Sequence, residues 1–196
     1  MTWQYLPQVV PTRRPLVFWA VCVALVMLIV SLIVVAPLAA ASGHSEVVEG
    51  IYRGFGIFCH QRPDRSYFID GHKLAVCSRC TGLYAGFAFT LLIYPLVRSL
   101  RSAATPPRRL LFFAAIPLMI DFGLTFFGVW ENTHTSRLLT GALLGSVVVF
   151  YVMPGIVDLS LRGLRLSPAP GPSFTLASPE SIAAAPSDYS APERRI

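Results

Sequence analysis

Three cysteines and a histidine in one polar segment are the residues best suited to chemistry in this sequence. Cys59 and His60 are adjacent, and Cys77 and Cys80 form a Cys-x-x-Cys pair further along the chain. That spacing places two thiolates on one turn, as in tetrahedral zinc sites and in redox dithiols. A third cysteine and a histidine, either His60 or His72, would complete a Cys₃His shell. We therefore predict a metal site, with zinc as the ion, formed by Cys59, His60, Cys77 and Cys80.

Two other uses of the same cysteines stay open. A structural disulfide between Cys59 and one member of the pair fits an oxidising compartment, although it leaves one thiol free. Alternatively, Cys77 and Cys80 could exchange a disulfide with a substrate while Cys59 acts as a resolving thiol. The remaining cysteine, Cys22, lies within an apolar run and is not part of this cluster.

A carboxylate inside an apolar run is the second chemical signal. Asp121 interrupts residues 110–130, where a charged side chain is costly unless it is paired, hydrated or protonated. A set of polar or small residues recurs from this position at helical spacing: Asp121, Thr125, Gly128 and Asn132. We expect this face to line a cavity, with Asp121 as the candidate catalytic residue. The alternative is a protonated aspartate that hydrogen-bonds to a neighbouring helix and holds the bundle together.

Arginines near the cysteine segment form the third signal. Arg65, Arg79 and Arg137 are expected to form a cationic rim that binds a lipid phosphate or another small anion. The alternative is that they pair with nearby acidic residues or with lipid headgroups. Arg137 is a poor partner for Asp121, because a rise of about 1.5 Å per residue places the carboxylate deeper than an arginine reaches. Cavity water or a nearer hydroxyl is the expected partner of Asp121.

Four long apolar segments must position these residues. The chain is 54% hydrophobic and only 13% charged, whereas a soluble domain averages about 25% charged. About 20 apolar residues cross the hydrocarbon core as a helix, and the first segment is longer than a signal-peptide core. We expect an all-α membrane protein, a four-transmembrane-helix bundle with a long Cys/His-containing loop between helices 1 and 2. The expected helices are at about 16–40, 78–97, 110–130 and 138–160.

The distribution of basic residues predicts the orientation. Arginines gather before the first helix, in the short loop 98–109 and after the fourth helix. By the positive-inside rule, both termini are cytoplasmic and the cysteine loop is extracytoplasmic, in the cell inner (cytoplasmic) membrane. The net charge of +6 comes from arginines flanking apolar runs, so the lipid bilayer is the expected partner and nucleic acid is not. The sequence specifies neither an oligomeric state nor a reaction.

The membrane domain is expected at 16–165, between an N-terminal cytoplasmic segment, 1–15, and a C-terminal tail, 166–196. The tail is rich in Pro, Ala and Ser and is expected to be disordered. Apolar residues at three- and four-residue steps predict an amphipathic helix over 47–58, on the membrane surface or against the bundle. Thr-Gly-x-x-x-Gly occurs at 81–86 and at 140–145, so the second and fourth helices are expected to pack closely at their outer ends.

These motifs together resemble a prokaryotic membrane-protein family designated domain of unknown function 2085. The resemblance covers roughly residues 45–150 and rests on Cys59-His60-Gln61-x-x-x-Arg65-Ser66, Gly71, Cys77-x-Arg79-Cys80-Thr81-Gly82, Pro117-x-x-x-Asp121, Asn132, Arg137 and Thr140-Gly141-x-x-x-Gly145. Phe122 stands where a glycine commonly follows the aspartate. The resemblance supports the fold and the choice of site residues, but implies no reaction. The other binding residues are then Gln61, Arg65, Arg79, Asn132 and Arg137.

Overall fold

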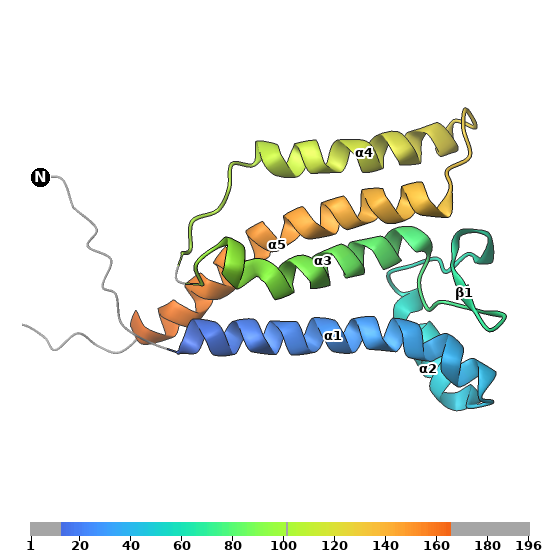
Figure 1. Ribbon diagram of the computed structural model, residues 1–196, viewed down its shortest axis with the longest axis horizontal. Coiled ribbons are helices and arrows are strands. Elements are labelled where there is room, and N and C mark those ends of the chain that lie inside the picture. The colour runs from blue at the N-terminus through green and yellow to red at the C-terminus, as the bar shows by residue number, and fades with distance from the viewer. Residues whose placement is uncertain (1–12, 101, 166–196) are drawn as a thin grey trace, which may run out of the picture. The chain divides into compact units, whose positions relative to one another are not determined.

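Four long helices make up most of the described chain. The computed structural model describes residues 13–100 and 102–165, with side chains up to residue 160. The long helices are α1 (Arg14–Ala41), α3 (Ser78–Val97), α4 (Arg109–Phe126) and α5 (His134–Arg165). All four are long and apolar enough to cross a membrane. The predicted fold class, a four-span helical membrane protein, is confirmed (Figure 1).

The chain separates into two units, Met1–Leu164 and Arg165–Ile196. The helices, the loops and the site described below belong to the first unit. The C-terminal tail expected at 166–196 lies outside the described residues, as does most of the N-terminal segment expected at 1–15.

The turn between α4 and α5 differs from the sequence expectation. α4 ends at Phe126, four residues before 130, and α5 begins at His134, four residues before 138. Gly128 adopts a positive φ of 68°, a conformation that ends helices and costs glycine little. Asn132 therefore does not lie on the helical face of Asp121 as expected, but on the segment that folds back toward it.

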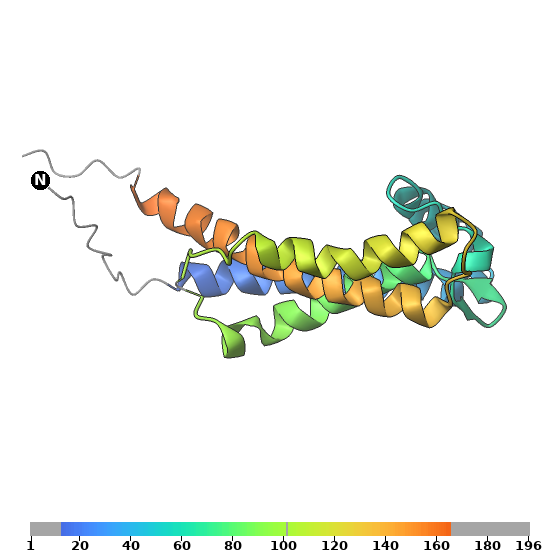
Figure 2. The same ribbon diagram turned by 90° about the horizontal axis from the view of Figure 1, so that it is seen from above.

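The two glycine motifs pack α3 directly against α5. A Cβ atom added to Gly82 would collide with the backbone of Leu138, and one added to Gly141 would collide with the backbone of Arg79. Gly145 meets α3 in the same way, so only hydrogen at these positions allows the helices to approach so closely. The predicted close packing of the second and fourth spans is confirmed, and Figures 1 and 2 both show α3 beside α5.

The other two membrane-spanning helices, α1 and α4, differ in how much of their surface is buried against the rest of the protein. On the α1 side, the indole Nε1 of Trp19 donates a hydrogen bond of 2.8 Å to the backbone oxygen of Leu91 in α3. A buried cluster that includes Tyr94 and Met153 fills the space between α3 and α5. In α4, by contrast, only 6% of the most apolar stretch is buried, so most of its surface is available to lipid or to another chain.

A small cap covers one end of the helices. It begins with the amphipathic helix α2 (Ser45–Gly56), as predicted, and continues through the 3₁₀ turn η1 (Pro63–Arg65). A two-stranded antiparallel hairpin follows, β1 (Phe68–Ile69) and β2 (His72–Lys73), joined by Asp70 and Gly71. Both turn residues have positive φ values, 49° and 78°, as a type I′ turn requires. Asp-Gly is the usual sequence of that turn, so the hairpin could have been predicted.

Candidate metal centre and adjoining cavity

The thiols of Cys59, Cys77 and Cys80 meet beneath the cap. Their sulfur atoms all lie within 4.8 Å of one another, close enough for one metal ion to bind all three. Around a tetrahedral zinc with Zn–S bonds of about 2.3 Å, sulfur atoms would be a little under 4 Å apart. All three are free thiols in the structure, and Cys59 is only 6% exposed. The cluster can therefore hold a metal ion.

Each thiol is held by an adjoining element of secondary structure. The amide of Cys59 donates to the carbonyl of Phe55 at the end of α2, at 2.9 Å. Cys77 immediately precedes α3, and Cys80 lies in the first turn of that helix. The amide of Cys77 also donates to the Cys59 sulfur at 3.2 Å. The cluster thus joins the end of α2 to the beginning of α3.

The surroundings of Cys77 favour its thiolate. Hydrogen bonds from the Cys59 thiol, and then from the Cys80 thiol, lower the pKa of Cys77. Backbone amides of Arg79 and Cys80, which point out of the helix start, act in the same direction, while burial opposes them. Because metals and disulfides both react with thiolates, this lowered pKa suits either use of the cluster.

Neither predicted histidine ligand belongs to the three-residue group. His60 is exposed and lines the cavity beside the cysteines. His72 is exposed in β2 and does not line that cavity. Of the two histidines, His60 is therefore the one that lines the same cavity as the three cysteines.

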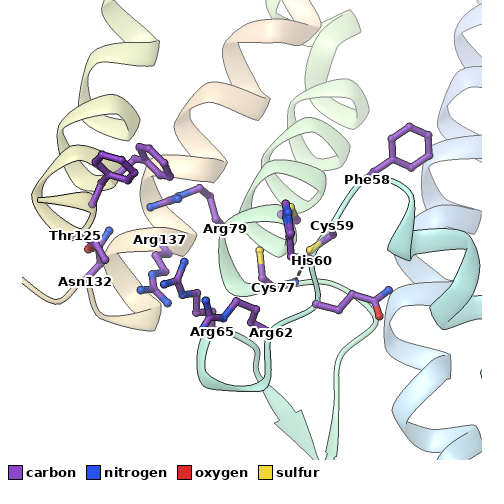
Figure 3. A pocket seen from close by; sticks show the side chains of 14 residues that line it. Phe58, Cys59, His60, Arg62, Arg65, Cys77, Arg79, Thr125, Asn132 and Arg137 are labelled. Atoms are coloured by element: carbon purple, nitrogen blue, oxygen red, sulfur yellow. Dashed lines mark hydrogen bonds between the residues drawn. The ribbon is translucent and has the colours of Figure 1, made fainter. Parts of the chain in front are cut away.

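A cavity of about 580 Å³ adjoins the cysteines (Figure 3). Its polar lining comes from the cap, the start of α3, the end of α4 and the start of α5. Four arginines contribute to it: Arg62, Arg65, Arg79 and Arg137. Figure 3 shows their side chains gathered between the cysteine cluster and the Thr125–Asn132 side of the cavity. The structure thus brings together the three arginines of the predicted rim and adds Arg62, which the sequence analysis missed.

The loop that bears Arg62 and Arg65 is fixed from both sides by buried serines. Ser66 donates from its hydroxyl to the carbonyl of Arg62 at 2.9 Å. Ser78, which is fully buried at the start of α3, donates to the carbonyl of Arg65 at 3.0 Å. Both arginines also contact Asp64, at 3.2 and 3.3 Å, on the exposed side of the loop. The cavity wall is therefore held by hydrogen bonds from serine side chains to the backbone, in addition to the surface ion pairs.

Asp121 is paired with Arg79. Nη2 of Arg79 lies 2.5 Å from Oδ2 of Asp121, and both side chains are largely buried. The amide nitrogen of Asn132 donates to the backbone oxygen of Asp121 at 2.5 Å. Arg79 is a partner that the sequence analysis did not name, and the Ser136 side chain also hydrogen-bonds to the Asp121 carboxylate, in keeping with the expected nearby hydroxyl. Asp121 lines a second, smaller cavity of about 450 Å³, and its predicted catalytic role stays a prediction.

Arg137 has a different environment from the other arginines. It is only 8% exposed, yet it forms no hydrogen bond or ion pair from its side chain with the described residues. Arg65 and Arg79 lie close enough to repel it electrostatically, and Asp121 and Asp64 attract it. Because Arg137 lines the cavity, its guanidinium is accessible there to a solvent molecule or to a ligand.

Gln61 helps to shape the cap. Its backbone has a positive φ of 49°, and its side-chain nitrogen donates to the carbonyl of Tyr52 at 2.6 Å. The ammonium of Lys73 donates to the Gln61 carbonyl at 2.8 Å. Gln61 also lines the cavity, as does Asn132, whose Oδ1 is buried without a hydrogen-bond partner in the described chain. Their predicted binding roles remain predictions.

The fold and site define a four-span helical membrane protein with a three-cysteine cluster beside an arginine-lined cavity. The chain belongs to the family of predicted membrane proteins called DUF2085, whose model matches residues 59–151. That match begins at Cys59 and extends into α5, so it includes the cysteine cluster, α3 and α4 but not α1.

Two similar proteins are both described as uncharacterized. One, from Methanocaldococcus jannaschii, is 39% identical over 115 residues, which are 59% of this chain and 74% of that protein. The other, from Methanothermobacter thermautotrophicus, is 36% identical over 106 residues, 53% of this chain and 93% of that protein. No solved structure matches the chain.

Proposed function

We propose that the protein is a zinc-binding membrane protein in which the metal fastens the cap over the end of the helices. The observation that supports this most directly is the approach of three sulfur atoms, from Cys59, Cys77 and Cys80, to within 4.8 Å of one another. Three thiolates together with one histidine are one of the four-ligand donor sets of structural zinc sites. Zinc bound here would join the end of α2 to the start of α3.

The electrostatics of the site support a thiolate-bound ion. Three thiolates and one Zn²⁺ carry a net charge of about −1 before a neutral fourth ligand is added. The adjacent cavity is lined by arginines, and Cys77 precedes the positive end of the α3 dipole. The Cys77 amide that donates to the Cys59 sulfur stabilises thiolate charge in the same way. The protein surroundings therefore favour the deprotonated sulfurs that zinc requires.

We propose His60 as the fourth ligand. It follows Cys59 in the chain and lines the cavity next to the cluster, so a side-chain rotation is the smallest change that would bring a nitrogen to the ion. Four protein ligands make a zinc site structural, whereas three leave a position for water. In this arrangement the zinc braces the cap, and the cavity beside it is the place where a ligand binds. Asp121 then acts by positioning Arg79 at the cavity wall.

The metal content of the full-length protein, purified in detergent, tests the proposal. We expect elemental mass spectrometry to find one zinc per chain in the wild-type protein. Most of this zinc should be lost in Cys59→Ser, Cys77→Ser and Cys80→Ser. Cys22→Ser is the matched control, because Cys22 lies in α1 and is not part of the cluster. Wild-type protein without stoichiometric metal after purification and after zinc addition would exclude the proposal.

Thiol–disulfide exchange is a second candidate, favoured by the lowered pKa of Cys77 at the start of a helix. The Cys77 thiolate would attack a disulfide in a partner protein, forming a mixed disulfide and releasing one partner thiolate. Cys80, after losing its proton, would then displace the second partner sulfur. Cys77 and Cys80 end oxidised and the partner ends reduced. Trapping of thiols in growing cells tests this, since one fixed oxidation state under all conditions excludes it.

A further inference from the structure

We propose that the arginine-lined cavity binds a phosphate group, carried either by a lipid headgroup or by free phosphate. The observation behind this is the meeting of four arginine side chains from three different parts of the chain at one cavity. Arg62 and Arg65 come from the cap, Arg79 from α3 and Arg137 from α5. The proposal uses the same cavity as the proposed zinc centre but different residues, so each can be tested without the other.

Charge at the cavity is not balanced by the described residues. The ion pairs formed by Arg62, Arg65 and Arg79 use only two carboxylates, those of Asp64 and Asp121. Two carboxylates neutralise at most two of the four arginines, and the proposed zinc–thiolate group, with its net charge of about −1, would neutralise at most one more. Asp64 is, moreover, a weak partner, because its contacts with both arginines lie on the exposed side of the loop. An anion bound between the arginines would supply the missing negative charge.

Arg137 is the strongest single indication. The residue is only 8% exposed, and its side chain lines the cavity and has no hydrogen-bond or ion-pair partner in the described chain. The like charges of Arg65 and Arg79 act on it from nearby. A cation beside other cations is unfavourable without enough counter-charge, and an anionic ligand in the cavity would add to that of Asp121 and Asp64.

Arg79 has donors to spare after its pairing with Asp121. The ion pair uses Nη2, whereas Nε is buried and has no hydrogen-bond partner in the described chain. The guanidinium also lies over the ring of Phe122, 5.7 Å from its centre, so its plane is held between α3 and α4. A planar guanidinium with fixed orientation and free N–H groups suits the oxygens of a phosphate, which it can bind through two parallel hydrogen bonds.

The apolar part of the cavity lining suits a lipid. Phe58, Phe122 and Phe126 line the cavity and are exposed, and the last two belong to the sparsely covered helix α4. The site lies where α3 begins and α4 ends, at the level of the helix ends. Phosphates of a bilayer lie at that level, just outside the hydrocarbon core. A lipid could therefore place its phosphate among the arginines and its chains along the phenylalanines of α4.

Binding to the full-length protein in detergent tests the proposal with two probes. For the lipid, the protein is incubated with vesicles of phosphatidylglycerol or phosphatidylcholine and returned to detergent, and native mass spectrometry measures the phospholipid that it retains. For the free anion, calorimetry measures binding of inorganic phosphate. The test variant is Arg137→Gln, with Arg65→Gln as a second. Arg53→Gln is the matched control, since its side chain is 80% exposed on α2 and does not line the cavity. A monodisperse elution profile and an unchanged helix content by circular dichroism verify that each variant is folded.

We expect the wild-type protein and Arg53→Gln to retain anionic phospholipid or to bind phosphate. Arg137→Gln is expected to bind the same probe at least about 10-fold more weakly. Retained lipid without phosphate binding identifies a headgroup, and phosphate binding without retained lipid identifies the free anion. The proposal is overturned if wild type binds neither probe, or if both cavity variants bind as wild type does. Absence of zinc from the wild-type protein together with intact phosphate binding would overturn only the metal centre.

Discussion

Arg79 and Asp121 form an ion pair of 2.5 Å between the first turn of α3 and the interior of α4. The backbone of Arg79 is also the surface against which Gly141 of α5 packs. One residue therefore joins three helices: its backbone through close packing and its side chain through charge. The cavity wall depends on both, because Arg79 lines the cavity and the two contacts hold its backbone and its guanidinium.

Removal of one partner of this pair is expected to destabilise the protein. Asp121→Asn leaves Arg79 with a neutral partner in a largely buried place, and we expect a loss of about 2–3 kcal/mol in the free energy of unfolding. Arg79→Gln should cost a similar amount, and the double variant less than the sum of the two. Unfolding in mixed micelles with increasing denaturing detergent measures these values.

The exposed pair of Arg53 and Glu49 on α2 provides the control for that experiment. Its members are 4 residues apart, at 2.6 Å, and their side chains are 80% and 70% exposed. Neutralising either should change stability by less than about 1 kcal/mol. Equal effects at the two pairs would show that the Arg79–Asp121 contact is not a special support of the bundle.

Enlargement of one glycine in the motifs is expected to separate α3 from α5. Gly141→Leu places a side chain where the backbone of Arg79 lies, so we expect a loss of at least about 2 kcal/mol, together with weaker phosphate binding. Gly155→Leu is the control on the same helix, because a Cβ there meets nothing within 4 Å. A comparison of detergent-induced unfolding of the two variants decides the matter, and similar stabilities would contradict the packing.

The choice of histidine at the metal centre can be tested by substitution with alanine. We expect His60→Ala to weaken zinc binding by on the order of 10-fold or more, and to change the visible spectrum of the cobalt-substituted protein as water replaces nitrogen. His72→Ala should leave both unchanged, since His72 lies in β2 outside the cavity. Unaltered zinc affinity in His60→Ala would assign the fourth position to water or to another group.

The orientation in the membrane is accessible to labelling of single added cysteines. We expect His72→Cys in the hairpin to react with a membrane-impermeant maleimide in intact cells, because the cap is predicted to be extracytoplasmic. Ala103→Cys, between α3 and α4, should react only after the cells are permeabilised. Both positions are exposed, and the wild-type chain measures the background from the native thiols. The reverse pattern would place the cap and its cysteines in the cytoplasm.

The sequence by itself determined the number of spans, because about 20 uncharged apolar residues have no favourable arrangement other than a membrane helix. It also determined which helices pack most closely, since small residues four apart have the same consequence in any bundle. The grouping of Cys77 and Cys80 was equally local. These features depend on short stretches of chain and on the solvent around them.

The partner of Asp121 depended on tertiary structure. Sequence distance along α4 and α5 argued correctly against Arg137 but gave no reason to choose Arg79, which is 42 positions earlier. The ion pair joins the first turn of α3 to α4, so the partner depends on how these two helices are placed in the folded bundle. The end of α4 was also decided beyond the helix itself, by Gly128 and the return of Asn132 to the Asp121 carbonyl.

Only the tertiary structure showed that Arg137 is buried without a partner and that Arg62 joins it at the cavity. Neither residue differs in type or local spacing from arginines that lie at membrane surfaces. Burial depends on which segments surround a side chain, and the cavity is lined by residues from the cap, α3, α4 and α5, which are far apart in the sequence. Local sequence thus specified the helices and the thiol pair, whereas the arrangement of charge around the cavity arose from contacts between distant segments.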